Sequence, residues 1–257
     1  MVTLECARSM NGPLPYRDFY YPLNVFMHIL TLEDGGVDSL HYGLFESADE
    51  PLAAAQQRAT GLLLARLPPP PARILDAGVG LGTTLALLTR LGHHAIGITP
   101  DEKQIAYLHA RYGDAVRAEC ARFEDFRGNF DVIVFQESSQ YIHSAALFAN
   151  AAQLTPRVLV MDEFSIDTSE GLHHPLDAFL AAAAANGFRV VEEVDLSAKA
   201  APTPDYFTAR LPRHREALTA ALGLTDQQVD ELIAGGKRYA ANYRNGLYSY
   251  RLIDLAR

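Results

Sequence analysis

Cysteine and positive charge are both scarce in this sequence. Its 257 residues include only Cys6 and Cys120, too few for a disulfide scaffold or a cysteine-rich zinc site, and compatible with a reducing cytoplasm. Lys and Arg total 22 against 31 Asp and Glu, which gives a net charge of −9. An acidic chain is poorly suited to nucleic-acid phosphates or to an anionic membrane surface, so we expect neither as a partner.

Long hydrophobic runs are also missing. The longest apolar stretch, residues 179–185, falls far short of the ~20 residues that span a bilayer. Residues 1–11 contain no apolar core of the kind found in signal peptides. From these observations we expect a cytoplasmic protein without a transmembrane helix.

Proline divides the chain into two parts. Residues 68–71 are four consecutive prolines, which act as a stiff spacer and disfavour helix before them. Residues 51–67 before this spacer are typical of a helix, and we interpret 1–70 as a helical N-terminal cap. Residues 71–257 then form the main domain. The whole chain is 49% apolar, which is enough for a large core.

Short apolar runs alternate with helical segments after the prolines, which predicts an α/β fold with a mostly parallel, doubly wound sheet. The expected strands are 73–77, 95–99, 130–136, 157–164, 188–196 and 248–256, and a short third strand precedes Cys120. The expected helices between them are 83–91, 100–112 and 175–186. Residues 198–246 interrupt this rhythm with two helix-like stretches, 212–222 and 225–243, and we interpret them as an insertion covering one end of the sheet.

The most informative segment is residues 74–84, ILDAGVGLGTT, a strand followed by a glycine turn and a helix. Glycines there allow a ligand to approach the backbone, and the helix N-terminus favours negative charge. The dinucleotide fingerprint G-x-G-x-x-G would place its third glycine at Thr83, which disfavours NAD. Any tight strand-to-helix turn can use glycine, but the carboxylate of Asp76 can also receive an ammonium group, which NAD lacks.

This segment resembles motif I of the class I S-adenosylmethionine-dependent methyltransferases. The resemblance covers about residues 71–197 and the last strand, and it implies a Rossmann-like, seven-stranded sheet with S-adenosylmethionine as cofactor. It implies further that the turn faces the methionine part of the cofactor. The residues concerned are Asp76, Ala77, Gly78, Gly80 and Gly82.

The second strand and the following helix resemble a branch of small-molecule enzymes that includes cyclopropane fatty acid synthases, tocopherol methyltransferases and natural-product methyltransferases. In that branch a threonine and a glutamine five residues later hold the ribose, and Thr99 and Gln104 match them. Asp101 is the alternative ribose ligand. Thr99 with Glu102 also forms a capping-box pattern, with Pro100 at the first helical position.

Two further segments fit the same branch. Phe123 and Glu124 match an aromatic–acid pair that borders the adenine, although Phe123 also suits an ordinary core position. The resemblance places Gln136 near the methionine amino group and Tyr42 over the cofactor, where an aromatic face attracts a sulfonium. Cyclopropane synthases carry a phenylalanine–glutamate–histidine run in the loop after the fourth strand. Residues 139–141 read Ser-Gln-Tyr here, which argues against lipid cyclopropanation.

No single residue is required as a general base. The candidates are Tyr141, His41 and His173, followed by His143 and His174. Asp162 and Glu163 lie near the two neighbouring histidines, but adjacent residues point in different directions and match no strong metal motif, so we expect no metal. We interpret His93 and His94 as surface residues of a turn.

These motifs favour transfer of a methyl group to an oxygen, nitrogen or carbon atom of a small, partly apolar metabolite of secondary metabolism. Aromatic and polar residues of the cap and the insertion would enclose it. They are Tyr16, Tyr20, Tyr21, His41, Tyr206, Phe207, His214, Tyr239 and Tyr243. A dinucleotide-dependent oxidoreductase and a non-catalytic cofactor-binding protein are the alternatives, and the sequence leaves open whether the chain forms a homodimer.

Overall fold

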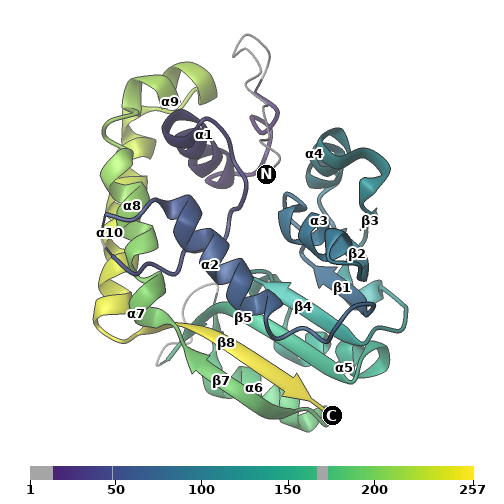
Figure 1. The fold of residues 1–257 in the computed structure, drawn as a ribbon. Coiled ribbons are helices and arrows are strands. Elements are labelled where there is room, and N and C mark those ends of the chain that lie inside the picture. The colour runs from purple at the N-terminus through teal and green to yellow at the C-terminus, as the bar shows by residue number, and fades with distance from the viewer. Residues whose placement is uncertain (1–13, 48, 167–172) are drawn as a thin grey trace.

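A seven-stranded sheet organises the computed structural model, which describes residues 14–47, 49–166 and 173–257 (Figure 1). The strand order is β3-β2-β1-β4-β5-β8-β7, and only β8 runs antiparallel to its neighbours. The strands are β1 (Arg73–Ala77), β2 (His94–Thr99), β3 (Ala118–Cys120), β4 (Val132–Gln136), β5 (Arg157–Ser165), β7 (Arg189–Asp195) and β8 (Tyr248–Ala256). A two-residue strand, β6 (His174–Pro175), pairs with the end of β5. The predicted mostly parallel, seven-stranded sheet is confirmed, with β6 as an addition.

Helices cover both faces of the sheet, which explains why β1, β4 and β5 are almost continuously apolar. On one face, Phe148 and Phe179 pack against Phe135. On the other face, Leu63 packs against Val134. The helices flanking the parallel strands are α2 (Leu52–Leu64), α3 (Thr83–Arg90), α4 (Glu102–Tyr112), α5 (Ser144–Leu154) and α6 (Leu176–Ala185), and the short 3-10 turns are η1 (Gly113–Ala115), η2 (Phe123–Asp125) and η3 (Ser139–Tyr141).

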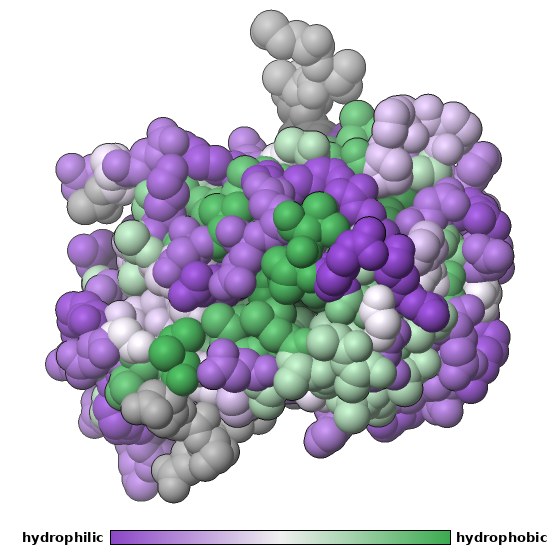
Figure 2. Space-filling model, turned by 90° about the horizontal axis from the view of Figure 1, so that it is seen from below, coloured by the Kyte–Doolittle hydropathy of each residue, from purple (hydrophilic) through white to green (hydrophobic). Residues whose placement is uncertain are grey.

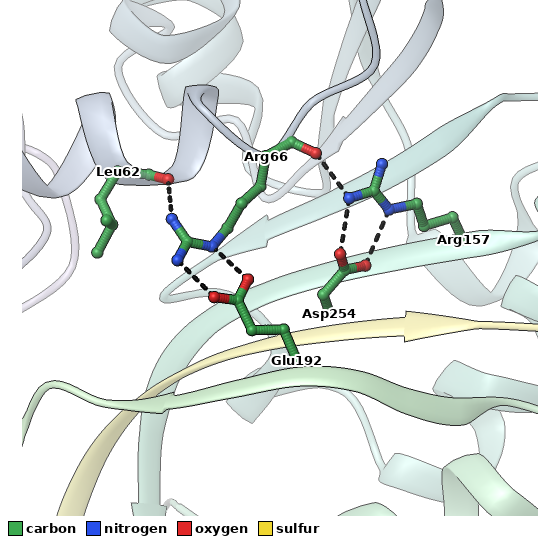
Figure 3. A network of polar contacts seen from close by, with 5 residues as sticks. All are labelled: Leu62, Arg66, Arg157, Glu192 and Asp254. Atoms are coloured by element: carbon green, nitrogen blue, oxygen red, sulfur yellow. Dashed lines mark hydrogen bonds and ion pairs between the residues drawn. The ribbon is translucent and has the colours of Figure 1, made fainter.

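The helix α2 differs from the expectation that residues 1–70 form a cap, because it packs directly on the sheet. Polar contacts fix the chain just beyond it (Figure 3). Arg66 forms two hydrogen bonds with Glu192 of β7, at 2.7 and 2.8 Å, and its carbonyl accepts a hydrogen bond from Arg157 of β5. Arg157 is in turn paired with Asp254 of β8. The chain before the proline run therefore contributes one of the layers around the sheet.

The insertion between β7 and β8 contains four helices, α7 (Ser197–Ala200), α8 (Pro202–Arg210), α9 (Arg215–Leu222) and α10 (Asp226–Arg244). The sequence indicated only the last two. Pro202 and Pro204 obscured α8, yet both lie in its first turn, where a missing N–H is tolerated. The N-terminal helix α1 (Leu23–Asp34) packs on this insertion, since Val25 and Ile29 share a cluster with α9 and α10.

Exposed apolar residues are not spread evenly over the surface. Figure 2 shows a band of hydrophobic residues on one face, bordered by hydrophilic ones. Among the described residues, Val190 and Val191 of the edge strand β7 are exposed, as are Tyr20, Tyr21 and Tyr141. All three tyrosines line the large cavity of the candidate site. Within the described ranges, no helix has the length and apolar character to cross a membrane.

Candidate functional site

A cavity of about 1340 Å³ lies at the carboxyl edge of the parallel strands. It is bordered by the N-terminal segment, the glycine turn, the ends of β2, β4 and β5, and the helices α8 and α10. Single drug-sized ligands occupy pockets of roughly 300–1000 Å³, so this cavity has room for a cofactor and a second molecule. A smaller cavity of about 340 Å³ lies between Asn129, Thr155 and Arg257, at the amino end of β5 and away from the motifs.

The glycine turn between β1 and α3 is shaped by three left-handed residues. A Cβ on Gly78 would lie 2.2 Å from the Ser138 side chain, and a Cβ on Gly82 would lie 2.6 Å from Leu108. These two glycines therefore let neighbouring elements pack closely. Gly78 and Gly80 line the cavity, and Gly80 has φ +52 with no such packing neighbour. Ala77 and Gly82, which were predicted to face the cofactor, lie outside the lining and support the turn from behind.

Asp76 is the most conspicuous polar residue of the cofactor side. It lines the cavity although its side chain is nearly fully buried, and its Oδ2 atom has no hydrogen-bond partner among the described residues. Burial raises the pKa of this carboxyl to about 7, because no cation lies beside it to stabilise the charge. An orphaned, buried carboxylate fits the ammonium group of an amino-acid ligand such as the methionine part of S-adenosylmethionine.

Thr99 and Gln104 meet as predicted for a ribose site. The Thr99 hydroxyl donates a hydrogen bond of 2.9 Å to the Gln104 amide oxygen, which leaves the amide hydrogens of Gln104 free to donate elsewhere. The alternative capping-box interpretation is wrong: Asp101 is the N-cap of α4 and accepts from the Lys103 backbone N–H at 2.8 Å. Asp101 also lines the cavity, but one of its oxygens is used by the helix.

The residues predicted to border the adenine lie on the 3-10 turn η2. Phe123 is buried, packs edge-to-face on Phe135 with 5.0 Å between the ring centroids, and lines the cavity. Glu124 lines the cavity as well and is paired with Arg122 at 2.7 Å. Asn150 of α5 donates to the Phe123 carbonyl and fixes the turn. The predicted pair is therefore both a core contact and part of the cavity wall.

Gln136 and Tyr42 lie where β4 meets the N-terminal segment. The Gln136 amide oxygen accepts from Thr84 at 2.9 Å, and Gln136 lines the cavity. Tyr42 stacks on Tyr250 at 5.7 Å, and its backbone N–H donates to Glu137 at 2.6 Å. Tyr42 also lines the cavity, so an aromatic residue borders the position predicted for the sulfonium.

Most of the candidate bases are placed unfavourably. His41 lines the cavity, but its Nε2 contacts the Thr60 hydroxyl and its Nδ1 contacts the Tyr42 carbonyl, so both nitrogens are used by the protein. Burial lowers its pKa to about 4. Tyr141 lies at the cavity mouth, 62% exposed, with its hydroxyl 3.4 Å from that of Tyr20. The interpretations of His41 and Tyr141 as bases therefore find no support in this geometry.

The remaining histidines considered in the sequence analysis lie outside the cavity lining. His143 is exposed and precedes α5, and the His174 Nε2 atom lies 2.9 Å from the Ser139 carbonyl; neither lines the cavity. His173 lies behind the wall and contacts both Gln140 and Tyr239. The surface interpretation of His93 is wrong, since its side chain is buried, whereas His94 is exposed.

A cluster of carboxyl groups and phenols forms the remaining floor. Its phenols include Tyr239, which was expected to help enclose the acceptor, whereas Glu163 was not among the predicted site residues. Glu163 of β5 accepts hydrogen bonds from Tyr239 at 3.0 Å and Tyr243 at 2.5 Å. Glu137 accepts from Tyr250 at 2.5 Å and is the one non-glycine residue with positive φ among the described residues, a strain typical of functional sites. Glu137 directly follows the buried strand β4, and Glu163 lies near the end of the buried strand β5; an acid at such a place is the signal that could have identified Glu163.

Asp162 completes this cluster behind the wall. It accepts from the backbone and the hydroxyl of Ser139, at 2.9 and 2.6 Å. Within residues 14–47, 49–166 and 173–257, no three histidine, cysteine or acidic side chains come together in a way that could hold a metal ion. Asp162 thus holds the loop after β4 in place.

Only some of the residues predicted to enclose an acceptor line the cavity. Tyr20, Tyr21, His41, Phe207 and Tyr239 line the cavity, but the others do not. The Tyr16 hydroxyl bonds to His28 and Thr31, the Tyr206 ring stacks on Arg210, His214 pairs with Glu33, and Tyr243 contacts Glu163 from behind.

Comparisons with known proteins agree with this fold. A family profile described as a methyltransferase domain matches residues 74–158. A ubiquinone biosynthesis O-methyltransferase from Nitrobacter winogradskyi is 35% identical over 91 residues, which are 33% of this chain and 35% of that protein. A second one, from Bradyrhizobium diazoefficiens, is 32% identical over 96 residues, 35% of this chain and 38% of its own length. The chain thus spans little more than a third of these relatives.

Solved structures resemble the chain over most of its length. A cyclopropane synthase from Mycobacterium tuberculosis superposes with a TM-score of 0.76 at 19% identity, covering 85% of this chain and 90% of that one. A geranyl diphosphate C-methyltransferase from Streptomyces coelicolor gives 0.65 at 19% identity, with 85% and 91% covered. At such low identity these similarities establish a shared fold.

Proposed function

We propose that this chain is a class I S-adenosylmethionine-dependent methyltransferase, which transfers the methyl group of S-adenosylmethionine to a small, partly apolar metabolite. The observation that carries the proposal is that the two halves of the large cavity are lined by different kinds of residues. One half is formed by the motif residues around Asp76, Thr99 and Phe123, and the other by aromatic and aliphatic residues of the N-terminal segment and the insertion.

The first half would hold the cofactor. Asp76 would pair with the ammonium group, the amide of Gln104 would donate to the ribose, and Phe123 would pack against the adenine. When bound, S-adenosylmethionine supplies an electrophilic methyl group on sulfur. The protein then has to orient the acceptor in line with that methyl group and to exclude water.

The second half would hold the acceptor. Its wall is mainly apolar and is contributed by α1, α8 and α10 together with the segment before α1. The side chains concerned include Tyr21, Leu23, Phe26, Phe207, Leu211 and Leu232. Apolar walls with a few hydrogen-bonding tips suit a drug-sized molecule, which supports a small metabolite as acceptor.

Calorimetry with S-adenosylhomocysteine tests the proposal directly. We expect saturable binding to the intact chain, and no comparable binding of NAD. Incubation with S-adenosylmethionine and a panel of small phenols, amines and alkenes, followed by mass spectrometry, should then reveal a product that is heavier by one methyl group. Failure to bind either S-adenosylmethionine or its product would refute the proposed function.

A further inference from the structure

Four side chains from separate segments form a hydrogen-bonded chain along the floor of the cavity. Gln140 of η3 contacts His173, with 2.8 Å between Oε1 and Nδ1. The His173 Nε2 atom contacts the Tyr239 hydroxyl of α10, and that hydroxyl donates to Glu163 of β5 at 3.0 Å. The chain therefore connects a carboxyl group, a phenol and an imidazole in sequence.

When Glu163 is ionised, this series of hydrogen-bonded side chains has one hydrogen too few to occupy all of its contacts. The Gln140 oxygen can only accept, so the Nδ1 atom of His173 carries the hydrogen between them. A neutral imidazole then has a bare Nε2, which competes with the Glu163 carboxylate for the single hydrogen of Tyr239. One of these two contacts lacks a hydrogen until an additional proton arrives. The arrangement is therefore built to accept one proton.

Burial decides where this additional proton resides. The pKa of His173 is lowered to about 4, chiefly by removal from solvent, so the imidazole stays neutral near pH 7. The same effect raises the pKa of Glu163 to about 7. The Tyr239 hydroxyl can donate to Glu163 or to His173, so it can pass a proton between the cavity and the carboxylate.

The groups that face Glu163 are acids and phenols, with no positive charge among those that the structure shows acting on it. They are Glu137 from the loop after β4, Asp162 of β5, Tyr42 of the N-terminal segment, Tyr239 and Tyr243 of α10, and Tyr250 of β8. Because no cation neutralises Glu163, protonation of this carboxyl is favourable whenever a proton becomes available.

The position of the chain is on the acceptor side of the site. Asp76 lies next to the end of β1, Gln136 ends β4 and Glu163 lies near the end of β5, which are consecutive strands of the sheet. The cofactor half is therefore followed along the sheet edge by Gln136 and then by Glu163. Glu163 and Tyr239 line the cavity, whereas His173 lies behind them and positions the Tyr239 hydroxyl.

We propose that Tyr239 and Glu163 together take the proton of the acceptor, and that the acceptor is a phenol or enol methylated on oxygen. The inference rests on the proposed function. In the reaction the acceptor oxygen forms a bond to the methyl carbon as the carbon–sulfur bond breaks, and S-adenosylhomocysteine leaves. The hydroxyl proton moves to the Tyr239 oxygen while the proton of Tyr239 moves to the Glu163 carboxylate.

Acidity selects this class of acceptor. A phenol such as tyrosine has a pKa of about 10, close enough to that of Glu163 for proton transfer during methylation. An aliphatic hydroxyl has a pKa far above that of a phenol, close to that of water, and is too weak an acid. An amine would arrive mostly as an ammonium ion, which has no free electron pair to methylate. The aromatic walls at Phe26, Phe207 and Tyr21 suit a planar acceptor.

The acceptor class is tested with three probes of similar length, 4-octylphenol, octylamine and 1-octene, each with S-adenosylmethionine and the intact protein. We expect the methyl ether of octylphenol as the main product. If S-adenosylhomocysteine binds but octylphenol is not methylated, the phenol assignment is wrong, whichever of the other probes reacts. If S-adenosylhomocysteine does not bind, the proposed function itself fails.

The proton-accepting role is tested by the pH profile of octylphenol methylation. For the wild type, kcat should rise with pH and reach half its maximum near pH 7, where Glu163 loses its proton. Glu163→Gln and Tyr239→Phe should lower kcat by about 10²-fold or more and remove this inflection. Tyr206→Phe, on α8 outside the cavity lining, serves as the matched control and should behave as the wild type. An unchanged profile in Glu163→Gln would overturn the proposal.

A measurement without turnover checks the hydrogen count. Nuclear magnetic resonance of isotope-labelled histidine should show His173 as the neutral tautomer with its hydrogen on Nδ1. A hydrogen on Nε2 near pH 7 would mean that Tyr239 donates to Glu163 alone, which would contradict the proton-accepting arrangement.

Discussion

Asp76 shows how a single residue connects the sequence motif to its chemistry. Its position before the glycine turn was visible in the sequence, but the orphaned Oδ2 atom is a tertiary property, created by the packing around β1. A carboxylate in this situation gains more from a cationic ligand than an exposed one would, because the ligand replaces lost solvation.

Replacement of Asp76 by Asn should weaken S-adenosylhomocysteine binding by about 10- to 100-fold, the value of a hydrogen bond to a charged group. Calorimetry at pH 6 in buffers of different ionisation enthalpy should also show proton release by the wild type, because Asp76 with a pKa of about 7 must ionise to pair with the ammonium. Asp131→Asn, an exposed ion-pair residue before β4, is the control and should leave both quantities unchanged. Equal affinity in Asp76→Asn would contradict the assignment.

The ribose contact discriminates between two neighbouring residues. Gln104→Ala should reduce cofactor affinity by about 1–2 kcal/mol, since it removes a polar contact and also the partner of Thr99. Asp101→Asn should have less effect, because Asp101 serves mainly as the N-cap of α4. Titration calorimetry of both variants, with Gln153→Ala on α5 as control, decides the order. A larger loss in Asp101→Asn would identify Asp101 as the ribose ligand.

At the scale of elements, the segment before α2 is joined to the cofactor side by a few partly exposed polar contacts. Lys103 donates to the Asp18 carbonyl, Arg111 contacts Val37 and Asp38, and Tyr20 meets Tyr141 at the cavity mouth. Exposed contacts of this kind contribute little each, so this outer part of the segment can open at small cost, whereas Tyr42 is held more firmly by its partly buried hydrogen bond to Glu137. The sequence indicated that this segment covers the site, but not which contacts hold it.

Hydrogen exchange should therefore respond to ligands in these elements. Residues 16–45 and 198–246 should exchange more slowly when S-adenosylhomocysteine and an acceptor are bound, because ligands fill the cavity that these elements close. These two ranges include the helices α1, α8 and α10. Helix α5 packs on the opposite face of the sheet and provides the internal control. Identical exchange with and without ligands would argue for a rigid, open site and a macromolecular acceptor.

At the scale of the whole molecule, the buried acids should make the stability of the folded protein depend on pH. The pKa values of Asp76 and Glu163 are raised by burial to about 7, whereas they are near 4 in an unfolded chain. Between these values the folded state binds more protons than the unfolded state, so stability falls as pH rises. The contribution is present in full below about pH 4 and is lost as pH passes 7.

Chemical denaturation of the ligand-free protein should consequently show a lower free energy of unfolding at pH 8 than at pH 5. The expected loss is on the order of 1.4 kcal/mol for each pKa unit that separates the two states. Glu163→Gln should reduce this dependence, and Glu192→Gln, at a partly exposed ion pair with Arg66, should not. Stability that rises from pH 5 to pH 8 would show that these acids are satisfied in a way that the structure does not show.

What the sequence determined is mainly what local pattern encodes. Apolar runs between helical segments specified the parallel sheet, and the LDAGVGLG turn and Thr99–Gln104 specified the cofactor side, because spacing along the chain and the ends of parallel strands place those residues together. The floor of the acceptor side could not be read in this way. Tyr239 lies 66 residues beyond His173 and 76 beyond Glu163 in the sequence, and only the packing of α10 against β5 brings it into contact with them. Burial, which shifts their pKa values, exists only after the chain has folded.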